Sequence, residues 1–161
     1  MRKDKMTIEW DIVANASDLP PKQQALLAAA KKALDKAYAP YSKFQVGAAL
    51  QLENGEIISG ANFENAAYPM CLCAERSAIA TAVSTFPDVA ATAIAITVKN
   101  PAHVISTPAS PCGACRQVMV ETEARQGKDM TVLMQGETGV IYVLESAKSL
   151  LPFYFDGSFL E

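Results

Sequence analysis

The stretch that decides the fold class is TAIAITV, Thr92 to Val98, a continuous apolar run with β-branched residues. Such a run is typical of a strand that is buried on both faces of a sheet. Helical patterns flank it on both sides, an alanine-rich one from about Cys71 to Ser84 and another from Pro111 to about Glu123. Proline is favoured at the first position of a helix. A buried strand between two helices favours an α/β fold.

The rest of the chain adds further helices and strands to this centre. Apolar residues at helical spacing predict a helix from about Pro21 to Tyr38, which Pro40 ends. Asn54-Gly55 predicts a tight hairpin turn with two positive φ angles. Four further strands are predicted at residues 44–52, 57–62, 131–135 and 140–144, and a last short helix at 145–151. We therefore expect a three-layer α/β/α sandwich with a mixed sheet of about five strands.

Length and composition indicate one globular domain. The chain has 161 residues, of which half are apolar and 19% are charged. This balance excludes a disordered chain, a collagen and a coiled-coil rod. We assign residues 21–161 to a single domain. Residues 1–20 form an N-terminal extension to which we assign no function.

Charge and cysteine content restrict the partners and the compartment. Fourteen basic and 17 acidic residues give a formal charge of −3, without the basic footprint of a duplex-binding protein. A small neutral or cationic molecule is the expected ligand. The longest nearly apolar run, residues 89–98, is far shorter than the about 20 residues of a membrane span. The N-terminus scatters charge where a signal peptide has an apolar core, so we expect a cytoplasmic protein with reduced thiols.

Two segments carry the chemistry, CAE at residues 73–75 and PCGAC at residues 111–115. The Cys-x-x-Cys spacing lets Cys112 and Cys115 reach one tetrahedral ion, and Cys73 is the expected third ligand. Three protein ligands and one open position are typical of a catalytic zinc site. Glu75 lies two residues after Cys73, where its carboxylate can take a proton from water and return it to a leaving group.

These segments, with several others, resemble the small, homotetrameric class of zinc-dependent cytidine deaminases. Three ligands, a non-ligand glutamate and Pro-Cys-x-x-Cys are typical of zinc deaminases. The matching segments are 38–44, 62–68, 71–76, 110–118 and 150–152 with Phe155. The likeness extends from about residue 22 to residue 157, in the order of the family. It implies hydrolytic deamination of cytidine and 2′-deoxycytidine to the uridine counterparts, with release of ammonia.

The resemblance also implies a role for each candidate residue. Zinc, one ion per chain, would be held by Cys73, Cys112 and Cys115, and Glu75 would transfer protons. The nucleoside would be bound by Phe44 at the pyrimidine, by Asn62 and Glu64 at the ribose hydroxyls, by the backbone near Ala66, and by Phe155 of another subunit. Arg76 would donate hydrogen bonds to the cysteine sulfur atoms and so withdraw charge from them.

Simpler structural interpretations stand beside these roles. Cys71 can join the other three cysteines in a closed, structural zinc site, but that alternative leaves Glu75 without a role. Arg76 can be an ordinary solvated charge on a helix. His103, the only histidine, is expected in a surface loop. Besides Phe155, the aromatic residues Phe153, Tyr154 and Phe159 can simply cover the edge of the core.

Three alternative functions remain open at this stage. A deaminase of another small cytosine-containing compound, such as a nucleoside antibiotic, would share the zinc motif but not need Asn62 and Glu64. A polynucleotide-editing deaminase would need a basic, aromatic channel, which this acidic chain lacks. A zinc-stabilised interaction module would need no catalytic carboxylate. Loss of cytidine absorbance with and without a zinc chelator distinguishes these alternatives.

Overall fold

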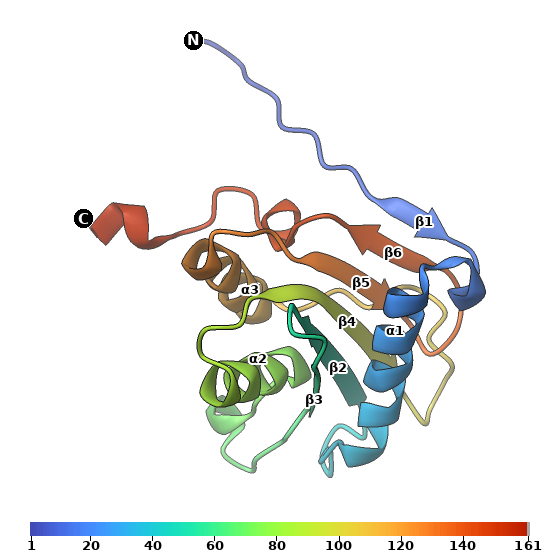
Figure 1. Ribbon diagram of the computed structural model, residues 1–161. Coiled ribbons are helices and arrows are strands. Elements are labelled where there is room, and N and C mark those ends of the chain that lie inside the picture. Colours follow the sequence, from blue (N-terminus) through green and yellow to red (C-terminus); the bar gives the residue numbers. More distant parts are fainter. Residues whose placement is uncertain (161) are drawn as a thin grey trace.

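A computed structural model describes residues 1–160, with one central sheet and helices on both faces (Figure 1). The strands are β1 (Asp11–Val13), β2 (Gln45–Leu52), β3 (Ile57–Ala61), β4 (Ala91–Lys99), β5 (Thr131–Gln135) and β6 (Ile141–Leu144). The helices are α1 (Pro21–Ala33), α2 (Ala74–Thr85) and α3 (Gly113–Gln126), with a short 3₁₀ segment η4 (Ala147–Leu150). No helix in these 160 residues combines the length and hydropathy that a membrane span requires.

The sheet is mixed, and the predicted buried strand lies inside it. Its strand order is β1-β6-β5-β4-β2-β3. β4 pairs antiparallel with β2 and parallel with β5, and the other neighbours pair antiparallel. Because parallel strands need a crossover connection, α3 lies between β4 and β5 in the chain. The mixed sheet of the prediction is confirmed.

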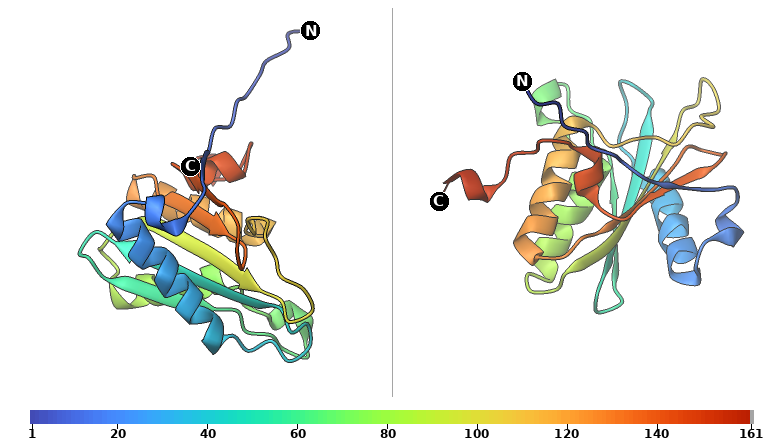
Figure 2. Two further views of the ribbon diagram at one scale, coloured as in Figure 1. Left: turned by 90° about the vertical axis from the view of Figure 1, so that its right-hand side faces the viewer. Right: turned by 90° about the horizontal axis from the view of Figure 1, so that it is seen from above.

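The two faces of the sheet carry separate cores. On one face, Leu26 and Ala30 of α1 pack with Ala49 and Leu133 of the sheet. On the other face, α2 and α3 pack against a second set of sheet residues that includes Ala48. Neighbouring residues of β2 therefore point to opposite faces, as the period of a strand requires. Figure 2 shows α1 alone on one side of the sheet and α2 with α3 on the other, so the three layers are confirmed.

The sheet has six strands, one more than the approximate number of five that was expected. The additional strand is β1, which pairs Asp11 with Val143 and Val13 with Ile141 at the edge of the sheet. The extension that we left without a role therefore contributes a strand. The three residues of β1 do not themselves alternate, since Ile12 and Val13 are both apolar, and the strand forms by pairing with the distant β6.

The β2–β3 connection also differs from the prediction. Of the Asn54-Gly55 pair, only Gly55 has a positive φ in the described chain, at 93°. The N–H of Gly55 donates to the carbonyl of Leu52 at 3.1 Å, and the N–H of Leu52 donates to the carbonyl of Glu56 at 2.9 Å. The loop therefore has three residues with glycine in the left-handed position, which is the next most common hairpin after the two-residue turn.

A glycine sets the distance between α2 and the sheet. A Cβ atom at Gly60 of β3 would lie 2.3 Å from the carbonyl oxygen of Ala74 and 2.6 Å from the backbone nitrogen of Ala78. Only glycine permits such a close approach of two backbones. The first turn of α2 therefore rests directly on β3. The helix begins at Ala74, not at about Cys71, and Cys73 is its N-cap residue.

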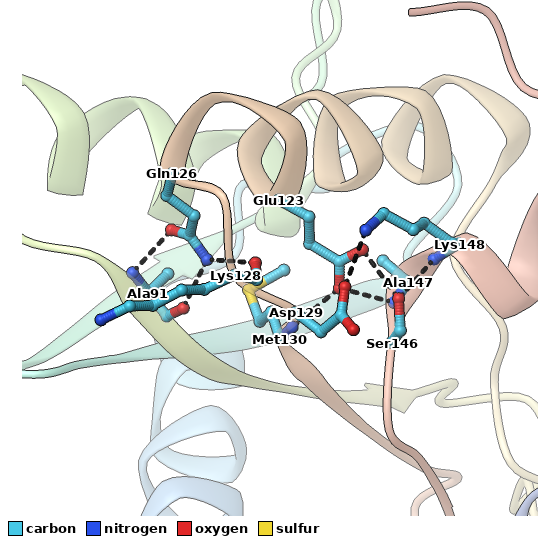
Figure 3. Close-up of polar contacts among 9 residues, drawn as sticks. All are labelled: Ala91, Glu123, Gln126, Lys128, Asp129, Met130, Ser146, Ala147 and Lys148. Carbon is cyan, nitrogen blue, oxygen red and sulfur yellow. Dashed lines mark hydrogen bonds and ion pairs between the residues drawn. The ribbon is translucent and has the colours of Figure 1, made fainter.

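The C-terminal half of α3 is tied to the rest of the fold by buried side chains (Figure 3). One carboxyl oxygen of Glu123 accepts hydrogen bonds from the backbone N–H groups of Met130 and Ala147, each at 2.8 Å. The other accepts from the hydroxyl of Ser146, also at 2.8 Å. The amide of Gln126 bonds both backbone groups of Ala91, at the start of β4. Glu123 thus holds η4 against α3.

Candidate active site

Three cysteine side chains converge on one point, as the spacing predicted. The sulfur atoms of Cys73, Cys112 and Cys115 all lie within 4.8 Å of one another. The Sγ–Sγ distance is 3.9 Å between Cys73 and Cys112 and 3.4 Å between Cys112 and Cys115. A tetrahedral ion with Zn–S bonds of about 2.3 Å has an S–S edge of about 3.8 Å. The three thiols therefore fit zinc, with one position left for a ligand that the protein does not supply.

Cys71 stays outside this group in the described residues. Its sulfur accepts a hydrogen bond from the backbone N–H of Asn65 at 3.3 Å. An isolated antiparallel bridge between Phe63 and Leu72 keeps the chain extended just before α2. The geometry thus favours an open, three-cysteine site over a closed, four-cysteine one.

The three thiols lie at the N-termini of two helices. Cys73 caps α2, Cys112 caps α3, and Cys115 lies in the first turn of α3. The positive ends of both helix dipoles therefore point at sulfur atoms, which favours the thiolate form. The hydrogen bond between Cys73 and Cys115 lowers the pKa of the Cys73 thiol to about 5 and raises the pKa of the Cys115 thiol, so the two sulfur atoms share a proton that a metal ion would displace. The site is suited to a divalent cation because a metal ligand must be deprotonated.

Glu75 projects from the first turn of α2 into the same space. Its side chain is only 4% exposed and lines the cavity together with Cys73 and Cys112. Burial raises the pKa of this carboxyl above its usual value. A carboxyl group with a raised pKa can both accept and return a proton near neutral pH. The contact of Gly60 with α2 fixes the height of this residue above the sheet.

Arg76 lies on the outer side of the thiol group. One terminal nitrogen donates to the carbonyl of Cys71 at 3.1 Å and lies 3.9 Å from the sulfur of Cys73. Its Nε is buried and has no hydrogen-bond partner within residues 1–160. The positive charge of Arg76 is therefore held beside the thiols, where it offsets their negative charge.

A cavity of about 330 Å³ opens in front of the thiols. Its walls are mainly apolar and include Phe44, which precedes β2, Val46 of β2, and the neighbouring residues Ile96 and Val98 of β4. Ligand sites usually have this character, with a few polar groups that fix the orientation of the ligand. The polar groups of Glu75, Asn62 and Glu64 also line the cavity.

The two predicted ribose ligands are positioned by backbone contacts. Glu64 accepts hydrogen bonds from the backbone N–H groups of Tyr41 at 2.9 Å and Ser42 at 3.2 Å, and from the hydroxyl of Ser42. The Ser42 hydroxyl makes the largest contribution to lowering the pKa of this carboxyl. Asn62 accepts from the N–H of Val46 at 2.8 Å and donates to the carbonyl of Phe44 at 2.9 Å. One N–H of its amide remains for a ligand.

Two predicted binding residues lie outside the cavity lining of this single chain. Ala66 is exposed, in the segment between Glu64 and Cys71. Phe155 is 56% exposed and stacks on Phe159 of its own tail, with ring centroids 5.4 Å apart. The predicted contact of Phe155 is with another subunit, so it stays a prediction. His103 is exposed in the loop after β4.

Sequence reasoning missed two residues that support the site. Ser42 holds Glu64, and its position inside the matching segment 38–44 was the only available signal. Arg116 donates from Nε to the carbonyl of Pro111 and from its terminal nitrogen to the carbonyl of Leu150, both at 2.8 Å. It thereby ties the loop before Cys112 to the C-terminal segment.

Comparison with known proteins agrees with this geometry. Residues 20–128 match the family described as the cytidine and deoxycytidylate deaminase zinc-binding region. A cytidine deaminase of Halalkalibacterium halodurans is 43% identical over 134 residues, which are 83% of this chain and 93% of that protein. The structure of a Burkholderia pseudomallei cytidine deaminase aligns with a TM-score of 0.70 and 42% identity, over 81% of this chain and 97% of that one. A Mycobacterium tuberculosis cytidine deaminase aligns with a TM-score of 0.63 and 30% identity, over 81% and 94% of the two chains. This chain therefore belongs to the zinc-binding cytidine and deoxycytidylate deaminase family.

Proposed function

We propose that this protein hydrolyses cytidine and 2′-deoxycytidine at C4, to give uridine or 2′-deoxyuridine and ammonia. The observation that carries the proposal is the position of Glu75. Its carboxyl group is buried beside three zinc-competent thiols and lines a cavity with mainly apolar walls. This arrangement combines a group that transfers protons with a space that fits a flat base.

Cys73, Cys112 and Cys115 would hold the metal. When bound, zinc supplies a water nucleophile near neutral pH, because it lowers the pKa of a coordinated water to about 7. Glu75 accepts the proton of the attacking water and delivers a proton to N3 of the pyrimidine. The same carboxyl group then relays a proton to the amino group, which leaves as ammonia. One water is consumed for each ammonia released, so the reaction needs no further reactant.

The polar groups that line the cavity support a nucleoside as the substrate. A ribose hydroxyl is both donor and acceptor, and the free N–H of Asn62 and an oxygen of Glu64 match it. Neither lysine nor arginine is among the described residues that line the cavity, whereas Glu64 and Glu75 both are. A phosphate group would meet negative charge there, so a nucleoside is favoured over a nucleotide.

The remaining residues have supporting roles in this proposal. Phe44 packs against the face of the pyrimidine, and the backbone near Ala66 orients the base. Arg76 compensates the charge of the three thiolates, which would otherwise weaken zinc as a Lewis acid.

An ultraviolet assay of cytidine loss tests the proposal. Purified zinc-loaded protein is compared with protein treated with a chelator and with chelated protein that has received zinc again. Cytidine should be deaminated, and cytosine should react much more slowly, since a site built for a hydroxyl penalises an analogue that lacks it. Deoxycytidylate should also react much more slowly, because its phosphate would meet the negative charge of Glu64 and Glu75. Absence of cytidine turnover in protein that contains one zinc per chain would overturn the proposal.

We further infer a homotetramer in which Phe155 of one subunit covers the pyrimidine in another. The exposed aromatic tail supports this, because Phe153, Phe155 and Phe159 are all exposed in the single chain. Exposed apolar clusters of this kind mark interaction sites. Light scattering should give about four times the chain mass, and Phe155→Ala should raise KM for cytidine. A fully active monomer would refute the shared site. A tetramer in which Phe155→Ala leaves KM unchanged would remove Phe155 from it.

A further inference from the structure

The N-terminal arm, residues 1–10, runs beyond the sheet that it leads into. Figures 1 and 2 show it as an extended chain that leaves the body of the protein at β1. β1 pairs with β6 on one side and is the last strand of the sheet, so its other side is free. β6 ends at Leu144, and within residues 1–160 the arm belongs to no strand or bridge. Its backbone makes no hydrogen bond with the backbone of the rest of the described chain, although Ile8 and Trp10 line a cavity together with Tyr142 and Leu144.

The arm nevertheless has the pattern of a strand. Apolar and polar residues alternate from Met6 to Ile12, with the apolar ones at even positions. This period of two is typical of a β-strand with one face covered. The four apolar side chains, however, are between 39% and 61% exposed; they are Met6, Ile8, Trp10 and Ile12. Only Trp10 has an aromatic partner in the described chain, Tyr142 at 5.9 Å.

The sequence of the arm is complementary to itself when it is reversed. In an antiparallel pair centred on Ile8, each residue i faces residue 16 − i of the other copy. Ile8 then faces Ile8, Met6 faces Trp10, and Thr7 faces Glu9. Lys5 faces Asp11, which places opposite charges together at both ends. Apolar pairs and opposite-charge pairs across neighbouring strands are both stabilising.

We propose that the arms of two copies of this chain pair antiparallel about a two-fold axis at Ile8. The free edge of each β1 continues into this pairing, so the sheets of the two subunits join into one. A two-fold contact uses the same patch on both partners, and a self-complementary strand fits this requirement. Pairing also protects an edge strand that would otherwise be open to non-specific association.

Two features favour a second copy of this chain as the partner of the arm. They are the charges of the arm and the end of β6 at Leu144. The subunit's own sheet offers no strand beside residues 5–9, because β6 turns into η4 after Leu144. A different protein would have to supply the complementary charges itself, whereas a second copy supplies them from its own Asp11 and Lys5. The pairing needs no contribution from the zinc site, so its test is independent of the deaminase activity.

Disulfide trapping tests the register. In an antiparallel pair, the Cα atoms of directly opposite residues lie about 4.5–5.5 Å apart, within the range of a disulfide. Ile8→Cys should therefore give a covalent dimer on mild oxidation of the zinc-loaded full chain. Met6→Cys is the matched control, because two Cys side chains at position 6 would be separated by four residues, about 13 Å along the strands. Non-reducing denaturing gels should show the dimer only for Ile8→Cys. No dimer, or equal dimer in both variants, would overturn the proposal.

A charge exchange tests the partner by a second route. In the Ile8→Cys background, Lys5→Asp and Asp11→Lys each place like charges opposite one another at both ends of the pairing. Each should slow dimer formation by about two- to tenfold at low salt. The double variant restores opposite charges and should restore the rate. Recovery of the rate of dimer formation identifies Lys5 and Asp11 as facing residues. The register would be refuted if the double variant forms the dimer as slowly as the single variants, or if the single variants are not slowed.

Discussion

Glu123 should be among the most important side chains for stability, although it lies outside the cavity. Glu123→Ala removes the acceptor of two buried backbone N–H groups, those of Met130 and Ala147. Each unsatisfied buried group costs about 1–3 kcal/mol, so we expect a total loss of about 2–6 kcal/mol. For a chain of this length, a central value of about 4 kcal/mol lowers Tm by about 8–16 °C.

Glu123→Gln is the matched control. Both backbone donors bond to the same carboxyl oxygen, Oε1, which the carbonyl oxygen of glutamine can replace. The new NH₂ group can donate to the Ser146 hydroxyl, which is able to accept. We therefore expect a loss of less than about 1.5 kcal/mol, the net value of an ordinary hydrogen bond.

Thermal and urea unfolding of the zinc-loaded variants measures both effects. The stability of Glu123→Ala should fall well below that of Glu123→Gln, and the latter should stay close to wild type. If the two variants are equally destabilised, the carboxylate charge matters more than the accepted hydrogen bonds. If neither is destabilised, the role assigned to Glu123 is wrong.

Three further predictions concern the active site. Glu75→Gln should keep one zinc per chain and lose activity by at least about 10²–10⁴-fold, because proton transfer alone contributes that much; turnover near wild type would exclude the role. Cys73→Ala should lose zinc, while Cys71→Ala should retain it, and metal analysis of both purified variants decides between the open and the closed site. Since the Ser42 hydroxyl lowers the pKa of Glu64, Ser42→Ala should raise that pKa. As the pH is lowered, KM for cytidine should then begin to rise at a higher pH in Ser42→Ala than in the wild type. Identical pH profiles of the two proteins would contradict this.

The strands and helices with strong periodicity could be predicted from the sequence. The buried run at residues 92–98 lies within β4, and the β5 prediction agrees with the structure at both ends. The start of α2 could not be predicted, because its N-cap is Cys73 and not a residue that usually caps helices. β1 could not be predicted because its stability comes from pairing with a strand about 130 residues away.

The candidate site was predictable for a different reason. The spacing of Cys112 and Cys115 within one helical turn is a local property, so it can be recognised without the fold. The contacts of Glu123 and Arg116 join segments that are up to 34 residues apart, and no local pattern indicates them. Sequence reasoning therefore indicates the candidate chemical groups more readily than the residues that hold them in place.

The three predicted zinc ligands come from chain segments before and after β4. Cys73 precedes β4 and Cys112 follows it, and the two lie 39 positions apart in the chain. No contiguous fragment that ends before α3 can assemble the complete metal site. Metal uptake is thus thermodynamically linked to folding of the whole sheet, and free zinc above its dissociation constant shifts the unfolding equilibrium by mass action. The zinc content of a preparation should therefore follow the fraction of chains that are folded. Release of zinc on heating should coincide with global unfolding.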